Sequence, residues 1–175
     1  MNKIEALTVI GFLLVVLSSC SKPAVDQPRS SSAPATSPAK ISSVAVVKVN
    51  ADEVDVSVGG SAEAKVRLNI DSGYHVNANP PTFSYLKPTE LAINSKPPIS
   101  VGSTIYPGAT TRKFQFADKP LAVYEGETVI KVQLKVDKGA SQGKQNLSGK
   151  LRVLACDEEV CYPPGERVIM ISVNI

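Results

Sequence analysis

The sequence predicts an all-β fold, a sandwich or small barrel of short strands. In several segments hydrophobic residues alternate with polar ones, which is the pattern of a strand with one buried face. Gly, Pro, Asn and Asp separate these segments at short intervals, as in β-sandwiches and barrels. No stretch has a convincing 3.6-residue hydrophobic period, so no amphipathic helix is expected.

Each expected strand has its own signal. Residues 44–49 are a β-branched run, and 53–58 alternate until Gly59-Gly60 ends the pattern. Aliphatic residues alternate with charged or amide residues in 64–70 and 130–136. One face of 147–155 is small or aliphatic, and this strand leads directly into a cysteine. Residues 168–175 are largely apolar, so Met170 in this strand is expected in the core.

The N-terminus predicts export and a lipid anchor. Residues 1–19 have a positive start and a mostly apolar stretch, as in a secretory signal peptide. The stretch is too short for a comfortable membrane span. Its end, Leu17-Ser18-Ser19-Cys20, resembles a bacterial lipobox, which implies cleavage before Cys20 and its lipidation. The alternative is a plain signal peptide with a chance cysteine. The expected location is the cell envelope, lipid-anchored and facing the periplasm or extracytoplasmic space.

The mature chain divides into a tether and one domain. Residues 20–43 begin with the lipidated cysteine and are rich in Ser, Pro and Ala, so they are expected to be a disordered tether. Residues 44–175 have a comfortable length for a single domain. The formal net charge is +3, from 19 basic and 16 acidic residues, which is too balanced to indicate nucleic-acid binding.

Cys156 and Cys161 are the most informative residues, because lipidation of Cys20 leaves them as a pair in an oxidising compartment. Their four-residue interval is a common hairpin loop length, so they are expected to face each other across two strands, with Cα atoms roughly 4.5–5.5 Å apart. Three roles remain open: a structural disulfide, a redox pair or metal ligands. A loop this short gains only about 2 kcal/mol from a disulfide, which argues against a staple.

Three carboxylates, Asp157, Glu158 and Glu159, lie between the cysteines. If they point toward the sulfurs, they should raise the thiol pKa values. In that case the two cysteines, joined as a disulfide, would be well suited to being attacked by a more acidic thiol of a partner protein. Tyr162 is a candidate to pack over the disulfide, and the prolines that follow indicate an edge or irregular segment that leaves the hairpin accessible.

Other candidate residues are few. His75 is the only histidine and is interpreted first as a packed structural residue. A single histidine excludes a blue-copper site and a His-rich zinc site. A Cu(I) site that uses both thiolates, with Met170 as a further ligand, remains an alternative on grounds of ligand softness.

Several motifs together resemble one family, the amino-terminal periplasmic domain of the thiol:disulfide interchange protein DsbD, also called the disulfide bond corrector family. The similarity covers roughly 44–175, and the cysteine segment with Tyr-Pro-Pro is its most specific part. In order, the motifs are Gly73-Tyr74-His75-Val76-Asn77-Ala78-Asn79-Pro80-Pro81, Tyr85-Leu86-Lys87-Pro88-Thr89-Glu90-Leu91, Tyr106-Pro107, Ala122-Val123-Tyr124-Glu125-Gly126 and 156–164.

The resemblance implies an immunoglobulin-like β-sandwich with the cysteine pair on a hairpin near one end. It also implies that Cys161 forms the mixed disulfide with a partner and that Cys156 resolves it. An aromatic residue on a cap loop would shield the pair; Phe116 best matches that position, and Phe114 is the rival. No cofactor beyond the Cys156–Cys161 disulfide, and no metal, is implied.

The leading hypothesis is therefore an extracytoplasmic thiol–disulfide exchange module that passes electrons between thioredoxin-like partners. It would act as the thiol:disulfide oxidoreductase component of a protein-disulfide reductase system. No transmembrane conduit or thioredoxin domain is recognised in the chain, so a separate membrane electron-conduit protein is an expected partner. The alternatives are a non-enzymatic immunoglobulin-like binding lipoprotein with a structural disulfide, or a Cu(I)-handling protein.

Overall fold

The computed structural model describes residues 42–175, which form strands connected by turns and loops, with no α-helix in that range. Residues 1–41, with the expected signal peptide, Cys20 and most of the tether, lie outside the described residues. In the described part of the chain there is no helix long and apolar enough to cross a membrane. The strands are β1 Val47–Ala51, β2 Val54–Asp55, β3 Ser61–Ile70, β4 His75–Asn77, β5 Glu90–Ile93, β6 Ile99–Ile105, β7 Thr110–Arg112, β8 Leu121–Tyr124, β9 Glu127–Val136, β10 Lys144–Val153, β11 Ala155–Cys156 and β12 Gly165–Asn174.

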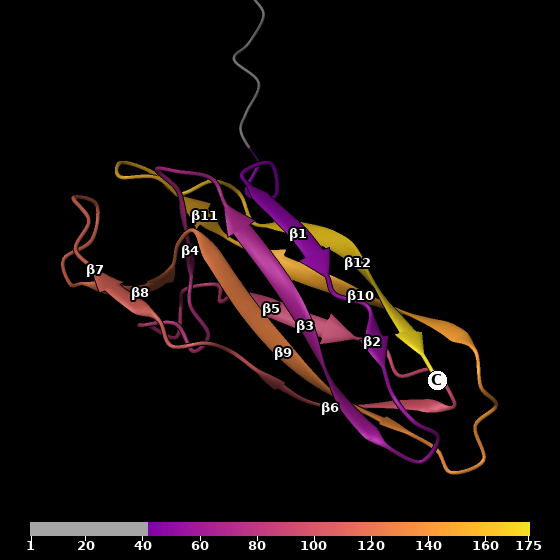
Figure 1. Ribbon diagram of the computed structural model, residues 1–175. Coiled ribbons are helices and arrows are strands. Elements are labelled where there is room, and N and C mark those ends of the chain that lie inside the picture. Colours follow the sequence, from indigo (N-terminus) through magenta and orange to yellow (C-terminus); the bar gives the residue numbers. More distant parts are fainter. Residues whose placement is uncertain (1–41) are drawn as a thin grey trace, which may run out of the picture. The chain divides into compact units, whose positions relative to one another are not determined.

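Two four-stranded sheets make the sandwich, and a third, smaller sheet lies at one end of it (Figure 1). The strand orders are β1-β3-β9-β6 and β2-β12-β10-β5 in the main sheets, and β11-β4-β8-β7 in the third. Neighbouring strands are antiparallel except for β2 and β12, which pair in parallel. The predicted all-β, immunoglobulin-like class is confirmed.

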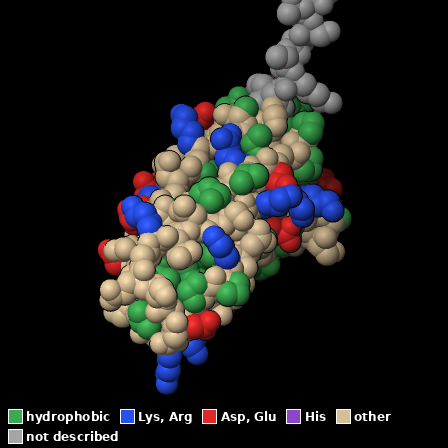
Figure 2. All heavy atoms as spheres, turned by 90° about the vertical axis from the view of Figure 1, so that its right-hand side faces the viewer, with side chains coloured by type: hydrophobic (Ala, Val, Ile, Leu, Met, Phe, Trp, Pro, Cys, Tyr) green, Lys and Arg blue, Asp and Glu red, His purple; other side chains and the backbone are tan. Residues whose placement is uncertain are grey.

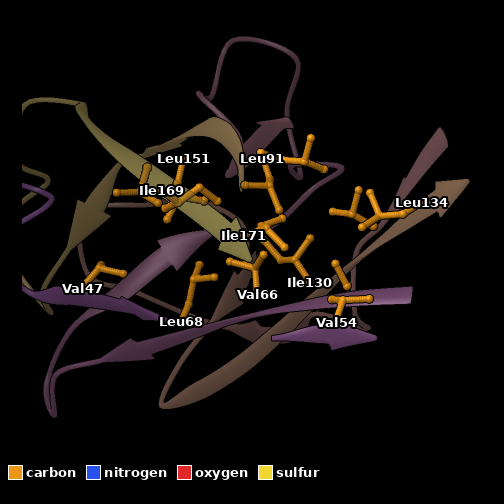
Figure 3. Packing of buried hydrophobic residues seen from close by; sticks show 14 of the residues in the cluster. Val47, Val54, Val66, Leu68, Leu91, Ile130, Leu134, Leu151, Ile169 and Ile171 are labelled. Atoms are coloured by element: carbon orange, nitrogen blue, oxygen red, sulfur yellow. The ribbon is translucent and has the colours of Figure 1, made fainter. Parts of the chain in front are cut away.

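The core lies between the two main sheets (Figure 3). Strand β9 alternates buried and less buried residues along nearly its whole length, which is what its alternating sequence predicts. Its partner β3 supplies Val66 and Leu68, and the facing sheet supplies Leu151 and Ile171; all four are at most 1% exposed. This interior holds the sandwich together and fixes the strands that lead to the third sheet.

The predicted strands all occur, with shifted ends, whereas the five strands from β4 to β8 were not predicted. Strand β6 pairs only with β9, and its register shifts between Val101 and Thr104, so its sequence lacks a regular alternation. Strands β5 and β7 are short and also pair on one side only. A short strand at the edge of a sheet needs no periodic apolar face, so the hydrophobic pattern of the sequence does not reveal it.

The strand expected over 147–155 is divided between two sheets. Residues up to Val153 belong to β10 and pair with β12 and β5, whereas Ala155 and Cys156 form β11 and pair with β4 in the third sheet. Leu154 lies between them, and its carbonyl oxygen accepts a hydrogen bond from Asn77 N–H at 3.4 Å. This change of sheet carries the first cysteine out of the main sandwich and to its end.

The folded domain begins earlier than the predicted boundary at Val44. Ser43, assigned to the tether, is fully buried. Its hydroxyl donates to the Pro163 carbonyl oxygen at 2.7 Å and accepts from Ala155 N–H at 2.9 Å. The serine therefore ties together the two ends of the cysteine segment, a long-range contact that local composition cannot reveal.

The exposed surface corrects one prediction about the core. Met170 on β12 is 54% exposed, and Val168 on the same strand is 66% exposed, because β12 turns only its alternate residues inward. On the face in Figure 2, Lys and Arg side chains lie beside Asp and Glu, and hydrophobic side chains occur in small groups. No histidine shows on that face, in agreement with the burial of His75.

Candidate functional site

Cys156 and Cys161 form a disulfide at the end of the sandwich. The two residues are antiparallel bridge partners, so the predicted arrangement across a hairpin is confirmed. Their Cα atoms are 3.9 Å apart, closer than the expected range. The two sulfur-bearing residues differ sharply in exposure, since Cys156 is 1% exposed and Cys161 lies in the exposed class. A thiol that approaches from solvent therefore meets Cys161 first.

Asp157 organises the turn between the cysteines. Its Oδ1 accepts hydrogen bonds from the backbone N–H groups of Glu159 and Val160, each at 2.8 Å. Its other oxygen accepts from the Tyr162 hydroxyl. That hydroxyl bond and the two backbone donors hold the pKa of Asp157 below its usual value, and the carboxylate raises the pKa of Tyr162 well above the usual one.

The carboxylates of the turn are thus engaged with other groups. Glu158 pairs with Arg112 of β7, with Oε1 2.8 Å from Nη2. Arg112 also pairs with Glu125, and its guanidinium lies 5.4 Å from the Phe114 ring centroid. The sequence expectation was conditional on the carboxylates pointing toward the sulfurs. Asp157 and Glu158 each have hydrogen-bond or ion-pair partners of their own.

The loop between β7 and β8, residues 113–120, carries both candidate cap residues. Phe114 is 1% exposed and packs in a small cluster with Leu121 and Val123. Phe116 is 39% exposed and stacks on Phe114, with ring centroids 5.3 Å apart. We name residues 113–120 the cap loop. Phe114 anchors this loop, and Phe116 is its exposed aromatic residue.

Cys161 and Phe116 line one surface hollow. Its other wall comes from the loop before β5, where Phe83 and Tyr85 stack with centroids 5.3 Å apart and Tyr85 is 75% exposed. We name this hollow the Cys161 groove. It is lined mainly by aromatic and aliphatic residues: Phe83, Tyr85, Leu86, Phe116, Ala117, Asp118, Lys119, Leu121 and Cys161.

Polar residues of β4 hold the loop that forms this wall. Asn77 donates from Nδ2 to the Lys87 carbonyl oxygen at 2.9 Å and accepts at its own carbonyl from the Thr89 hydroxyl at 2.7 Å. Asn79 in turn donates to the Thr89 carbonyl oxygen at 2.9 Å. Asn77 and Thr89 are buried, so these bonds satisfy groups that would otherwise cost stability.

His75 lies beneath the cap loop and beside the disulfide. It is the Cα partner of Cys156 across β4 and β11, and its ring stacks on Phe114 with centroids 4.0 Å apart. It is 1% exposed, and its Nε2 has no hydrogen-bond partner. Burial lowers the pKa of His75, although the nearby carboxylates of Glu125 and Glu158 oppose that shift.

The structure brings most of the sequence candidates to this end of the fold. The two cysteines, Phe114, Phe116 and His75 meet there, while Tyr162 packs against Tyr74, with ring centroids 5.9 Å apart, and against the main core. Met170 is in a different sheet from Cys156. Within 42–175 no group of three or more His, Cys, Asp or Glu side chains is placed to hold a metal ion.

Sequence reasoning missed Arg112 and the groove wall. Arg112 acts through contacts with Glu125 and Glu158, which are far from it in sequence. Tyr85 begins one of the noted motifs, and Phe83 lies two residues before it. This pair of aromatic residues in a proline-rich segment was the available sequence signal of an exposed aromatic surface.

These features define a class, namely an all-β sandwich that carries, at one end, an unequally exposed disulfide beside an aromatic loop. The sequence model of the family described as "Thiol:disulfide interchange protein DsbD, N-terminal" matches residues 43–172. The chain belongs to this family. A comparison with curated proteins finds no match.

One of two similar solved structures supports the fold, the one with the higher TM-score. The N-terminal periplasmic domain of ScsB from Proteus mirabilis is 20% identical, with a TM-score of 0.51 over 71% of this chain and 45% of that one. This chain thus matches less than half of that protein's length. The N-terminal domain of DsbD from Neisseria meningitidis, in the reduced form, is also 20% identical, with a TM-score of 0.38 over 69% of this chain and 82% of that one.

Proposed function

We propose that this protein is an extracytoplasmic thiol–disulfide exchange module that passes electrons between thioredoxin-like partners through Cys156 and Cys161. The observation that carries the proposal is the unequal exposure of one disulfide, with Cys161 exposed in an apolar groove and Cys156 buried. Membership of the family supports the same chemistry. A purely structural disulfide has no need of one sulfur at the surface beside exposed aromatic residues.

The exchange would proceed through a mixed disulfide. A thiolate of the partner attacks Cys161 Sγ, the Cys156–Cys161 bond breaks, and Cys156 leaves with the electron pair as a thiolate. A second thiolate of the partner then attacks the mixed disulfide and releases Cys161, so the partner is oxidised and this protein is left as the dithiol. The reverse sequence passes both electrons on to a second partner.

The cap loop would control access to Cys161. Phe116 lines the groove together with Cys161 and stacks on the ring of Phe114. Because Phe114, and not Phe116, belongs to the small buried cluster, Phe116 can move while that cluster stays in place. The ion pair of Arg112 with Glu158 joins the end of β7, where this loop begins, to the cysteine turn. This ion pair is exposed, so it contributes little stability and permits the loop to open when a partner binds.

The expected setting is the periplasmic side of the cell envelope. The ScsB domain that shares the fold is an N-terminal periplasmic domain. We propose that Cys20 carries a lipid anchor and that the following residues form the tether. We further propose that a separate membrane electron-conduit protein, with a thioredoxin-like domain, supplies the electrons.

Thermal unfolding distinguishes this proposal from a binding module with a structural disulfide. The short loop predicts that reduction removes about 2 kcal/mol, so the midpoint of the domain should fall by less than about 10 °C. The Cys156→Ser/Cys161→Ser double variant is the control, because reductant should leave its midpoint unchanged. A fall of more than about 20 °C on reduction would favour the structural role.

A further inference from the structure

The buried side of the disulfide faces a histidine to which the proposed exchange has so far given no role. His75 and Cys156 are direct partners in antiparallel strands. Their neighbours Val76 and Ala155 belong to the main core. Successive side chains of a strand point to opposite faces, so His75 and Cys156 lie together on the other face. Directly opposed residues have Cβ atoms about 4.5–5.5 Å apart, so the side chains of His75 and Cys156 are neighbours.

The imidazole lacks a partner in the oxidised protein. Its Nε2 is buried and makes no hydrogen bond within the described part of the chain. Leaving such a buried group unpaired is unfavourable, and folded proteins rarely keep one without a reason. A sulfur is a weak acceptor unless it is ionised, so the intact disulfide does not satisfy this nitrogen. The stacking of Phe114 on the ring, at 4.0 Å, holds the imidazole in its place.

The exchange step leaves a negative charge on the sulfur of Cys156, which is the residue opposite His75. When Cys161 is attacked, the electron pair of the broken bond stays on the Cys156 sulfur. Cys156 is 1% exposed, and burial disfavours a thiolate because water cannot solvate it. A hydrogen-bond donor beside this sulfur would therefore stabilise the leaving group, and His75 is its direct cross-strand neighbour.

We propose that His75 is the hydrogen-bond partner of Cys156 once the disulfide opens, with its Nε2–H donating to the leaving thiolate. This inference rests on the proposed function. The partner thiolate forms a bond to Cys161 Sγ, the bond between the two cysteines breaks, and Cys156 carries the negative charge. No proton is transferred in this step. Cys156 later takes a proton from water, or it attacks the mixed disulfide in the reverse reaction.

Burial keeps the imidazole neutral against the charges around it. The charged groups that act on it are Arg112 from β7, Glu125 after β8, and Asp157 and Glu158 from the cysteine turn. The three carboxylates favour the protonated ring, although Arg112 is paired with both glutamates and opposes them. Burial is the largest influence and lowers the pKa of His75, so the ring is neutral at pH 7 and acts through its N–H group.

The test is the pKa of Cys156 in the reduced protein, measured without any partner. In a Cys161→Ser background, the ultraviolet absorbance of the thiolate is followed against pH, after subtraction of the curve of the variant that lacks both cysteines. The His75→Phe change keeps a flat ring against Phe114 and removes the donor. It should raise the pKa of Cys156 by about one unit, a tenfold smaller thiolate fraction at a given pH. An unchanged pKa would overturn the proposal.

Two further measurements keep the test sharp. The His75→Gln variant retains an N–H donor and should restore at least half of the shift; a value equal to that of His75→Phe would contradict a hydrogen bond. In the Cys161→Ser protein with His75 intact, the nitrogen chemical shift of Nε2 should change with the same pH midpoint as the Cys156 thiolate. If the Nε2 chemical shift did not change at this pH midpoint, the proposal would also be overturned. Because no partner is present, these results are independent of whether exchange occurs.

Discussion

The Cys156→Ser protein is expected to form a stable mixed disulfide with a thioredoxin-like domain, whereas Cys161→Ser should not. The probe is a thioredoxin-like domain that keeps one active-site cysteine, activated with thionitrobenzoate. Attack by the Cys161 thiolate would form the covalent adduct and release free thionitrobenzoate, which is read by its colour. Cys161 is exposed in its groove, so attack needs no unfolding of the sandwich.

The buried cysteine should react far more slowly. Cys156 is 1% exposed, and an opening that costs about 3 kcal/mol would slow its reaction roughly 100-fold. The two variants are matched controls, because both lack the disulfide and each keeps one thiol. Equal adduct formation by both would show that exposure does not determine the attacking cysteine, and a lack of adduct with Cys156→Ser would contradict the exchange role.

The largest effect on stability is expected from Gly149→Ala in β10. Strand β5 passes so close to this glycine that an added Cβ would meet the Ile93 Cδ1 atom and would lie 2.7 Å from the Ala92 carbonyl oxygen. The Ile93 side chain can turn away, but the backbone oxygen cannot move without disturbing the β5–β10 pairing. We expect a loss of about 1–3 kcal/mol in the free energy of unfolding, measured by urea titration.

Gly139→Ala provides the matched control for this substitution. No atom lies within 4 Å of the position its Cβ would take, so the free energy of unfolding should change by less than about 0.5 kcal/mol. Equal losses in the two variants would show that the close approach of β5 is not what requires a glycine at position 149.

Much of the fold could be predicted because its main strands have one buried face. Alternation identified β3 and β9, whose long ladder forms the middle of one main sheet. In the last strand the prediction rested on a largely apolar sequence and overestimated burial, because Val168 and Met170 are apolar yet exposed. Hydrophobic residues on the outer face of a strand disturb the period-two pattern, and sequence alone cannot assign them to a face.

The cysteine pair and the candidate cap residues could be named in advance, but their environment could not. The facing of Cys156 and Cys161 followed from a short interval in sequence. The stacking of His75 on Phe114 and the ion pair of Arg112 with Glu158 join segments that are distant in the chain, and the strand order β11-β4-β8-β7 of the third sheet brings them together. Such contacts depend on the topology of the sheets, which local sequence patterns do not reveal.

The reduction potential of the Cys156–Cys161 pair tests the proposed function most directly. Purified protein would be equilibrated with glutathione or dithiothreitol buffers, and the two redox forms separated after thiol labelling. An exchange role predicts a value between roughly −180 and −270 mV, the range of known exchange proteins. A value well below about −300 mV would mean a disulfide that partners cannot reduce, and it would contradict an exchange role in favour of a structural one.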